Sequence, residues 1–372
     1  MLEKNIIDSI KKDDSLFSLA HKEDFALPLY DPSSHYIEIT RSGYFRALTI
    51  VRHYIRQSSD YYFSRECNAK NVDLFMLTPS VSSPLGAGSD SEAIEILFGN
   101  LHTYLVDSSQ FGFEPLLLNG FDRVYCYLPS MRGEDPDKRH LNQFFHCEAE
   151  IIGSLEDLIP LVEGYIRALC ETIISMPHII DMISVNPEAT KTILTNVIKQ
   201  NSFQRITFDD AINLLTVHNK KDFWKETPFG KDITSAGEIE VMKLLHSTTP
   251  VWITHYDRDR VPFYQKPETN NPNKAINADL IFPPIIEGAF GGEIVGCGQR
   301  QDIALEMYDS LKRQNVDAKA YDWYINLRNL PNYSSTSGFG LGVERFIAWA
   351  FGKDDIKDVI LYPRLKNVIT YP

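Results

Sequence analysis

The stretch "GFGLGVERFIAW", residues 338–349, alternates glycine with apolar residues and then changes its period. Gly338, Gly340 and Gly342 recur at every second position, so in an extended backbone they share one face, where a flat ligand can approach closely. After the last glycine, apolar residues recur at helical spacing. The stretch predicts a strand followed directly by a helix, with Arg345 in the first turns of that helix. Tight packing of the strand against the helix is the alternative explanation of the glycines.

The stretch "SMRGEDPDKRHLNQFFHCEAE", residues 130–150, predicts two strands joined by a charged loop. Arg139 and His140 lie in this loop, and arginine binds phosphate oxygens in a bidentate manner. The returning strand alternates, which places one set of side chains on a single face. That set is Phe144, His146, Glu148 and Glu150. An aromatic ring there could stack on a base and a carboxylate could hold an ammonium group, whereas a solvated surface hairpin is the alternative.

The stretch "ADLIFPPIIEGAFGGEIVGCGQR", residues 278–300, carries two acidic residues at or near strand positions. Asp279 and Glu293 supply oxygen ligands of the kind that suits Mg²⁺ when it bridges phosphates. Glycines leave room beside them, and Arg300 follows at once. Taken alone, this pattern is weak evidence for a metal site.

The composition is that of an ordinary globular protein, with 372 residues, 43% of them apolar, and a net charge of -13. The N-terminus is charged, and no run is apolar and long enough for a leader or a membrane span, so we expect a cytoplasmic protein. Five cysteines lie far apart without a CxxC pair, which predicts free thiols and no zinc site. The acidic balance disfavours nucleic-acid contact, which usually depends on a basic surface.

The order of the predicted elements favours an α+β fold. Strands precede and follow a mostly helical region, and they do not alternate strictly with helices. This order argues against a doubly wound parallel sheet and favours a mostly antiparallel β-sheet flanked by helices. We expect a short N-terminal lead-in over 1–40 and one domain over 41–372, with a helical insertion at about 155–247.

Several of these stretches resemble the signature motifs of class II aminoacyl-tRNA synthetases. "MRGE…RHLNQFFHCEAE" resembles motif 2, "GFGLGVERF" resembles motif 3, and Pro79 in "FMLTPSVSSP" resembles the proline of motif 1. Within this class the Asp/Asn/Lys subgroup is the most similar, and within the subgroup the asparaginyl enzymes. The similarity runs in order from about residue 41 to 364. It implies the class II catalytic core and a homodimer that is built through motif 1.

The resemblance implies an ATP site. The glycine strand would form the floor under the adenosine, and Arg132 would hold the α-phosphate together with the amino-acid carboxylate. Phe144 and Arg345 would enclose the adenine, and Arg345 would also meet the terminal phosphate. The outer phosphates would meet the loop residues Arg139 and His140. The residues assigned to ATP in this way are Arg132, Glu134, Arg139, His140, Phe144, Gly338, Gly340, Gly342 and Arg345.

The resemblance also implies a metal site and an amino-acid site. Glu293, together with Asp279, would hold Mg²⁺, and Glu293 would act with Arg132 and Arg345 as the catalytic set. The reaction is in-line attack of a carboxylate on the α-phosphorus of ATP, which yields an aminoacyl-adenylate and pyrophosphate, mainly through positioning and charge stabilisation. The residues for the amino acid are Gln110 and Glu148 at the ammonium group, and Arg300 and Arg328 at the side chain.

The acceptor of the activated amino acid is the open question. Only about 40 residues precede the motif 1 region, roughly half of what the OB-fold that grips the anticodon needs, so we expect that domain to be absent. This absence and the acidic charge favour a ligase that adenylates an aspartate- or asparagine-like acid and transfers it to ammonia or another small amine. Proteins related to archaeal asparagine synthetase are similar. Transfer to tRNA is disfavoured but not excluded, and an asparaginyl-type aminoacyl-tRNA ligase without an anticodon domain is the first alternative.

A non-catalytic paralog that binds ATP or an amino acid is the second alternative. Leu85, Gln143 and Asn326 depart from the residues usual in the family motifs, which keeps this alternative open. The retained Arg132 and Glu293 argue against it, because buried charges are costly to keep without a ligand or a partner.

Overall fold

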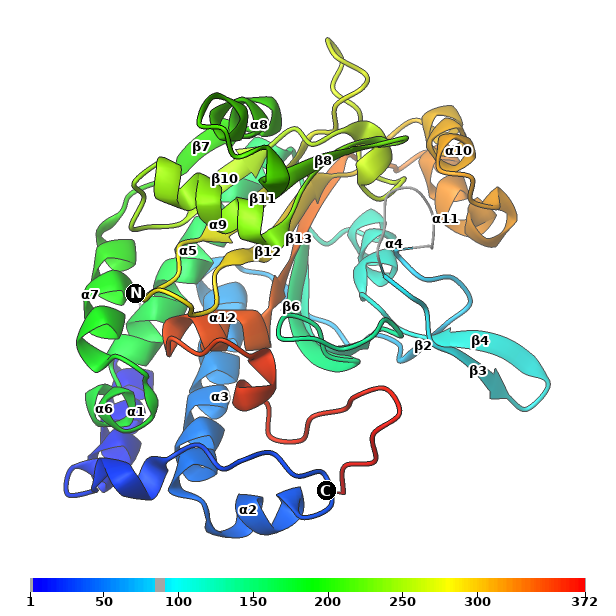
Figure 1. Ribbon diagram of the computed structural model, residues 1–372. Coiled ribbons are helices and arrows are strands. Elements are labelled where there is room, and N and C mark those ends of the chain that lie inside the picture. Colours follow the sequence, from blue (N-terminus) through cyan, green and yellow to red (C-terminus); the bar gives the residue numbers. More distant parts are fainter. Residues whose placement is uncertain (1–2, 84–90, 372) are drawn as a thin grey trace.

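An eight-stranded sheet forms the centre of the protein (Figure 1), whose computed structural model describes residues 3–83 and 91–371. Its strands are β1 Lys70–Asn71, β5 Arg123–Met131, β6 Gln143–Ile152, β7 Gln204–Thr207, β10 Val251–Thr254, β11 Asn277–Phe282, β12 Gly292–Gln299 and β13 Thr336–Gly342. Their order in the sheet is β1-β5-β6-β13-β12-β11-β10-β7. The outermost pair at each edge is parallel, and the pairs between them are antiparallel. The predicted α+β fold with a mostly antiparallel sheet is therefore confirmed.

The alternation of β6 separates the hydrophobic core from the functional face of the sheet. Cys147 and Ala149 are at most 2% exposed and pack within the largest hydrophobic cluster. Phe144, His146 and Glu148 alternate with them and line cavities on the opposite face. Because side chains of a strand point alternately to its two sides, one segment can serve the core and the site together.

Three helices cover the core face of the sheet: α3 Gly43–Tyr61, α5 Leu155–Ile174 and α12 Val343–Ala350. α12 begins directly after the glycine strand β13, as the change of period predicts. A capping box starts α5, since the Ser154 hydroxyl accepts from the Asp157 amide and the Asp157 carboxylate accepts from the Ser154 amide. In Figure 1, α4, α10 and α11 lie on the other side of β6 and β13 from α3 and α5. Their bounds are α4 Phe113–Leu118, α10 Ala304–Arg313 and α11 Asp322–Ile325.

The N-terminal segment packs into the same core as the rest of the chain. Helix α1 Lys4–Asp14 contributes Ile6 and Ile10, which are at most 9% exposed. The Asp14 carboxylate accepts hydrogen bonds from the backbone amides of His178 and Ile179 on helix α6 Pro177–Ile183. The segment predicted as a lead-in thus shares a hydrophobic core with the domain, and α2 His35–Arg41 joins it to α3.

The region over 155–247, predicted as a helical insertion, also contains three strands. One of them, β7, completes the edge of the main sheet by pairing in parallel with β10. The other two, β8 Trp224–Thr227 and β9 Gly230–Ile233, form a hairpin. The region is therefore part of the central sheet as well as of the helical layer. Its other helices are α7 Pro187–Lys199, α8 Phe208–Val217 and α9 Ser235–Leu244.

A small second sheet lies beside the site face. Its strands are β2 Leu77–Thr78, β3 Glu95–Phe98 and β4 Leu101–Leu105, in the order β2-β4-β3. Pro79 follows β2 directly, and Thr78 pairs with Tyr104. All five cysteines are buried free thiols. Among the described residues, no helix has both the length and the apolar character needed to cross a membrane.

Candidate active site

Two adjoining cavities lie on the sheet face opposite the main core. The first has a volume of about 450 Å³ and the second about 380 Å³. They share a wall, so groups bound in the two cavities would meet there. The residues that line both cavities are Ser83, Arg132, His146, Glu293 and Gly340.

The first cavity is lined by cationic side chains. The Arg132 guanidinium lies 5.4 Å from the ring centre of Phe144, and Arg345 Nη1 lies 3.2 Å from Glu293 Oε2. Across the described part of the chain, the Nε atoms of Arg132 and Arg139 are buried without a hydrogen-bond partner. Burial lowers the pKa of the Arg139 guanidinium. Buried cationic donors without partners are costly, so the cavity is suited to an anion.

The loop between β5 and β6 supplies the rest of the first cavity's charged lining. His140 Nδ1 lies 2.9 Å from the Asp137 carboxylate, and burial followed by the charge of Arg345 lowers the pKa of His140. The Glu134 carboxylate accepts a hydrogen bond from the Glu92 amide at 3.1 Å. Both loop side chains line the cavity, as the sequence predicts for residues near phosphate.

The three alternating glycines fall on different parts of the site. Gly342 lines the first cavity, Gly340 lines both cavities, and Gly338 lines the second. A Cβ atom on Gly338 would collide with Arg300 and Glu150. The structure therefore places only two of these glycines at the first cavity, and Gly338 makes room for a buried ion pair.

Glu293 at the shared wall and two carboxylates of the second cavity, Asp279 and Glu238, lie where the sequence predicts a metal site. Burial, followed by the charges of Glu293 and Glu238, raises the pKa of Asp279 well above its ordinary value. Burial opposes the ionisation of Glu293, but the neighbouring arginines, Arg345 foremost, outweigh it and lower its pKa. A Cβ atom on Gly296 would lie 3.4 Å from Asp279 Oδ1 and 3.5 Å from Glu293 Oε1, so the glycine keeps the space beside both oxygens open.

This arrangement fits Mg²⁺ as a substrate-bound ion. No group of three or more metal-binding side chains is found among the described residues. Mg²⁺ is commonly held by one or two carboxylates together with substrate phosphates. Asp279 and Glu293, with the third carboxylate Glu238 close by, match that pattern, because a cation would relieve the mutual repulsion that raises the pKa of Asp279.

The second cavity contains a buried carboxylate, Glu148, which is 4% exposed. Its oxygens accept hydrogen bonds from the Ser108 hydroxyl and from the Ser109 amide, the latter at 2.8 Å. Burial raises the pKa of Glu148 to about 7 despite these bonds. Nearby, Gln110 Nε2 is buried and has no hydrogen-bond partner within the described ranges. A cation bound here would stabilise the ionised carboxylate, as the predicted role in holding an ammonium group requires.

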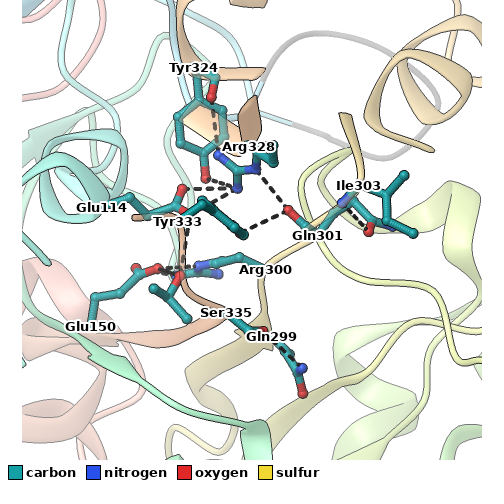
Figure 2. Close-up of polar contacts among 11 residues, drawn as sticks. Glu114, Glu150, Gln299, Arg300, Gln301, Ile303, Tyr324, Arg328, Tyr333 and Ser335 are labelled. Carbon is teal, nitrogen blue, oxygen red and sulfur yellow. Dashed lines mark hydrogen bonds and ion pairs between the residues drawn. The ribbon is translucent and has the colours of Figure 1, made fainter. Parts of the chain in front are cut away.

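Two arginine–glutamate pairs lie close together (Figure 2), and Arg300 of the first pair lines the second cavity. Arg300 Nε and Nη2 donate to Glu150 at 2.9 and 2.8 Å, and the two side chains are 4% and 0% exposed. Arg328 Nη2 donates to Glu114 at 2.9 Å, and both of these side chains are fully buried. The Thr336 hydroxyl lies within hydrogen-bond distance of both glutamates and links the two pairs.

The structure corrects the predicted role of Arg328. This residue lines neither cavity, and its guanidinium is occupied by Glu114, by Tyr324 and by the backbone carbonyl of Gln301. Its charge and donors are already satisfied, so it supports the wall behind Arg300 and leaves the cavity contact to Arg300 (Figure 2).

Three contributors to the site were not predicted as such from sequence. Glu344, next to Arg345, points to the core side, where it accepts from the Phe145 amide at 2.8 Å and lies 2.7 Å from Arg52. Glu238 accepts from the Glu293 amide and has a pKa raised to about 7 by burial. His146 lines the shared wall, and its place on the alternating face of β6 was the one available signal.

The remaining predicted site residues all come together at the two cavities. Leu85 lies outside the described residues, and so does the loop over 84–90. The predicted residues that line the first cavity are Arg132, Glu134, Arg139, His140, Phe144, Glu293, Gly340, Gly342 and Arg345. Those that line the second are Gln110, Arg132, Glu148, Asp279, Glu293, Arg300, Gly338 and Gly340.

One arginine serves both cavities, so an anion in the first and a carboxylate in the second would meet beside Arg132. An antiparallel sheet that brings such groups together defines the catalytic domain of a class II aminoacyl-tRNA synthetase. The chain belongs to this class, because the family "tRNA synthetases class II (D, K and N)" matches residues 33–366.

Curated relatives point to the asparaginyl branch. The chain is 28% identical over 319 residues to a probable cytoplasmic asparagine–tRNA ligase of Encephalitozoon cuniculi, covering 84% of this chain and 65% of that protein. It is also 28% identical over 357 residues to the asparagine–tRNA ligase of Mycoplasma genitalium, covering 91% and 74%. The chain thus spans somewhat under two thirds of the first relative's length.

Solved structures share the fold. Asparaginyl-tRNA synthetase of Pyrococcus horikoshii, in complex with asparaginyl-adenylate, superposes with a TM-score of 0.80 at 24% identity, covering 94% of this chain and 76% of that one. The asparaginyl-tRNA synthetase of Entamoeba histolytica, also with asparaginyl-adenylate, gives a TM-score of 0.74 at 24% identity, covering 92% and 73%.

Proposed function

We propose that this protein activates asparagine with ATP, forming asparaginyl-adenylate and pyrophosphate, and transfers the asparaginyl group to tRNA. The observation that carries the first step is the shared wall of the two cavities. It puts Arg132, with an unsatisfied buried donor, beside both the cationic first cavity and the Glu148 side of the second. A phosphate and an amino-acid carboxylate would converge there without further rearrangement of the fold.

The activation step follows from charge and position. One carboxylate oxygen of the amino acid attacks the α-phosphorus, the bond to the bridging oxygen of the β-phosphate breaks, and its electron pair leaves with pyrophosphate. No proton needs to move. Arg132 would hold both reacting groups, and Arg139 and Arg345 would bind the outer phosphates, so the site supplies orientation and charge stabilisation.

Phe144 supports a place for the base at the open end of the first cavity. Its ring already has one cationic neighbour, the Arg132 guanidinium at 5.4 Å. A base stacked on the ring would leave its phosphates pointing toward the arginines. Asp279 and Glu293 would hold Mg²⁺, which when bound neutralises phosphate charge.

The side-chain end of the second cavity favours a neutral substrate. Arg300 is the cation there, and its charge is already balanced by Glu150 through a bidentate pair. A second carboxylate, that of aspartate, would have to compete with Glu150 for that charge, whereas the amide of asparagine needs only hydrogen bonds. Because Glu150 already neutralises Arg300, the cavity supports asparagine over aspartate as the amino-acid substrate.

The curated relatives support tRNA as the acceptor over ammonia. Both relatives described above are asparagine–tRNA ligases. Transfer to ammonia or a small amine, which the acidic charge favours, has no comparable support. A non-catalytic paralog is disfavoured by the unsatisfied donors of Arg132 and Arg139, which are costly without an anion. A homodimer built through the α3–β2 region stays part of the proposal.

The deciding experiment is ATP–pyrophosphate exchange with each of the twenty amino acids, without tRNA. We expect exchange with asparagine and at least tenfold less with aspartate, since a tenfold preference corresponds to about 1.4 kcal/mol. Unfractionated tRNA is then added to test stable charging, and ammonium chloride to test amide formation. Amide formation without charging would replace the acceptor in this proposal, and absence of exchange with any amino acid while ATP still binds would overturn it.

A further inference from the structure

A histidine lies where the two cavities meet. His146 is on β6, between the predicted base-binding Phe144 and the buried carboxylate Glu148, and it lines both cavities. Its side chain is 13% exposed, and its ring packs edge-on against Phe144 with the ring centres 4.8 Å apart. The reaction proposed above would take place against this side chain.

The hydrogen bond to Ser130 determines which ring nitrogen carries the proton. Ser130 is 1% exposed, and its hydroxyl lies 2.9 Å from His146 Nδ1. No other hydrogen-bond partner of this hydroxyl occurs among the described residues. A buried hydroxyl keeps its proton on an acceptor, and Nδ1 is the acceptor at hand. Nδ1 therefore accepts, and the neutral ring has its N–H at Nε2.

The Nε2–H group is an uncharged donor without an acceptor among the described residues. Nε2 makes no hydrogen bond to any residue that the structure describes, while Glu148 Oε1 lies 3.5 Å from Nδ1, at the limit of a hydrogen bond. Burial, followed by the charges of Arg132 and Arg345, lowers the pKa of His146 well below its ordinary value. The ring stays neutral at physiological pH, so it adds a donor to the shared wall without adding another positive charge.

We propose that the Nε2–H group of His146 donates a hydrogen bond to the acyl phosphate as the amino-acid carboxylate joins the α-phosphate. This inference rests on the proposed adenylation. Of the charged side chains at the shared wall, Glu293 can only accept, and Arg132 binds both substrates before they react. A neutral donor at the junction stabilises charge where it develops, and such donors are most effective in a site that excludes water.

The test is asparagine-dependent ATP–pyrophosphate exchange by two variants of the full chain. His146→Met keeps the side-chain volume but removes the donor, and we expect kcat to fall about 100- to 1000-fold with KM for ATP within threefold, as for the loss of one transition-state donor. His146→Gln carries an N–H group near the position of Nε2, and we expect it to recover most of the rate. His102→Met, on a histidine that is 76% exposed in the β3–β4 hairpin, serves as the matched control and should behave as the wild type.

A double-variant cycle tests the positioning role of Ser130. Ser130→Ala should lower the rate about three- to tenfold, and Ser130→Ala should have no further effect in the His146→Met background, because coupled residues are not additive. If His146→Met fails to fold, judged by circular dichroism and thermal unfolding, Ser130→Ala and His146→Gln carry the test.

The outcomes separate this inference from the proposed function. If the wild-type protein shows exchange and the His146→Met variant exchanges at the same rate, the proposed role of His146 is overturned and the proposed adenylation stands. Equal loss in the Met and Gln variants also overturns it, because a packing role would explain that result. A wild-type protein that shows no exchange overturns both proposals together.

Discussion

Four arginines of the site form two groups that differ in their partners. Arg300 and Arg328 have 4% and 0% of their side chains exposed, and each faces a glutamate at 2.8 or 2.9 Å. Arg132 and Arg139 line an open cavity, and the Nε atom of each is buried without a partner among the described residues. A fully buried arginine whose charge a glutamate balances builds the wall of the site. An arginine that keeps an unpartnered donor is available for a phosphate, and Arg139 is one of these although Glu238 lies 3.6 Å from its guanidinium.

The first way to break this contrast is to remove a partnered arginine. Arg328→Met leaves Glu114 charged and fully buried, and we expect a loss of about 3–5 kcal/mol in the free energy of unfolding. Urea or thermal unfolding measures it. The double variant Glu114→Leu/Arg328→Met should recover much of the loss, since an apolar pair avoids the unpaired charge. An unchanged midpoint in Arg328→Met would show that the pair does not stabilise the wall.

The second way is to remove an unpartnered arginine. Arg132→Met takes away a donor that has no partner within the described part of the chain, so stability should change little while exchange activity falls about 10²–10³-fold, or about 3–4 kcal/mol in the barrier. Exchange kinetics and thermal unfolding are measured on the same sample. A large loss of stability with little loss of activity would reverse the assignment of the two groups.

The contrast between partnered and unpartnered arginines can be sharpened by removing the negative charge of one pair without changing the size of its side chains. Glu150→Gln leaves Arg300 with a positive charge that no carboxylate balances, so the preference for asparagine over aspartate should fall by about tenfold, or about 1.4 kcal/mol. The ratio of kcat/KM values in exchange measures this shift. Glu156→Gln, at a side chain that is 71% exposed, is the control and should keep the wild-type ratio.

The smallest expected effect is a pH dependence of amino-acid binding. Burial raises the pKa of Glu148 to about 7 in the free protein, so the carboxyl group becomes protonated as the pH falls through that value. The protonated form cannot attract the substrate ammonium group. The kcat/KM for asparagine should therefore fall about fourfold between pH 8 and pH 6.5. A flat profile over this range would argue against ionised Glu148 as the ammonium contact, and kcat/KM for ATP at saturating asparagine is the control.

Sequence patterns predicted secondary structure and side-chain orientation correctly where these depend only on a short stretch of the chain. The glycine alternation and the change of period predicted β13 and α12, and the alternation of β6 separated Cys147 and Ala149 from Phe144 and Glu148. Periods of two and of 3.6 residues are properties of the backbone, so they can be recognised in sequence without knowledge of the fold.

Partners far apart in sequence could not be predicted in this way. We predicted that Arg328 contacts the substrate, but it is paired with Glu114, which lies 214 residues earlier in the chain. Gly338 makes room for another such pair, between Arg300 and Glu150. The strand β7 was missed inside a helical region because its four residues join the sheet only through β10. Such facts depend on which segments the fold brings together.

The sequence by itself determined the class of fold, the strand–helix unit that carries Arg345, and nearly all of the side chains that line the two cavities. Their residue types and spacing follow from local backbone geometry and from the chemistry of phosphate and ammonium binding. Only the tertiary structure decided which arginines are free to bind a ligand, because an arginine's role depends on which of its donors the fold leaves without a partner. For the same reason, only the structure revealed His146 as a neutral donor at the wall between the cavities.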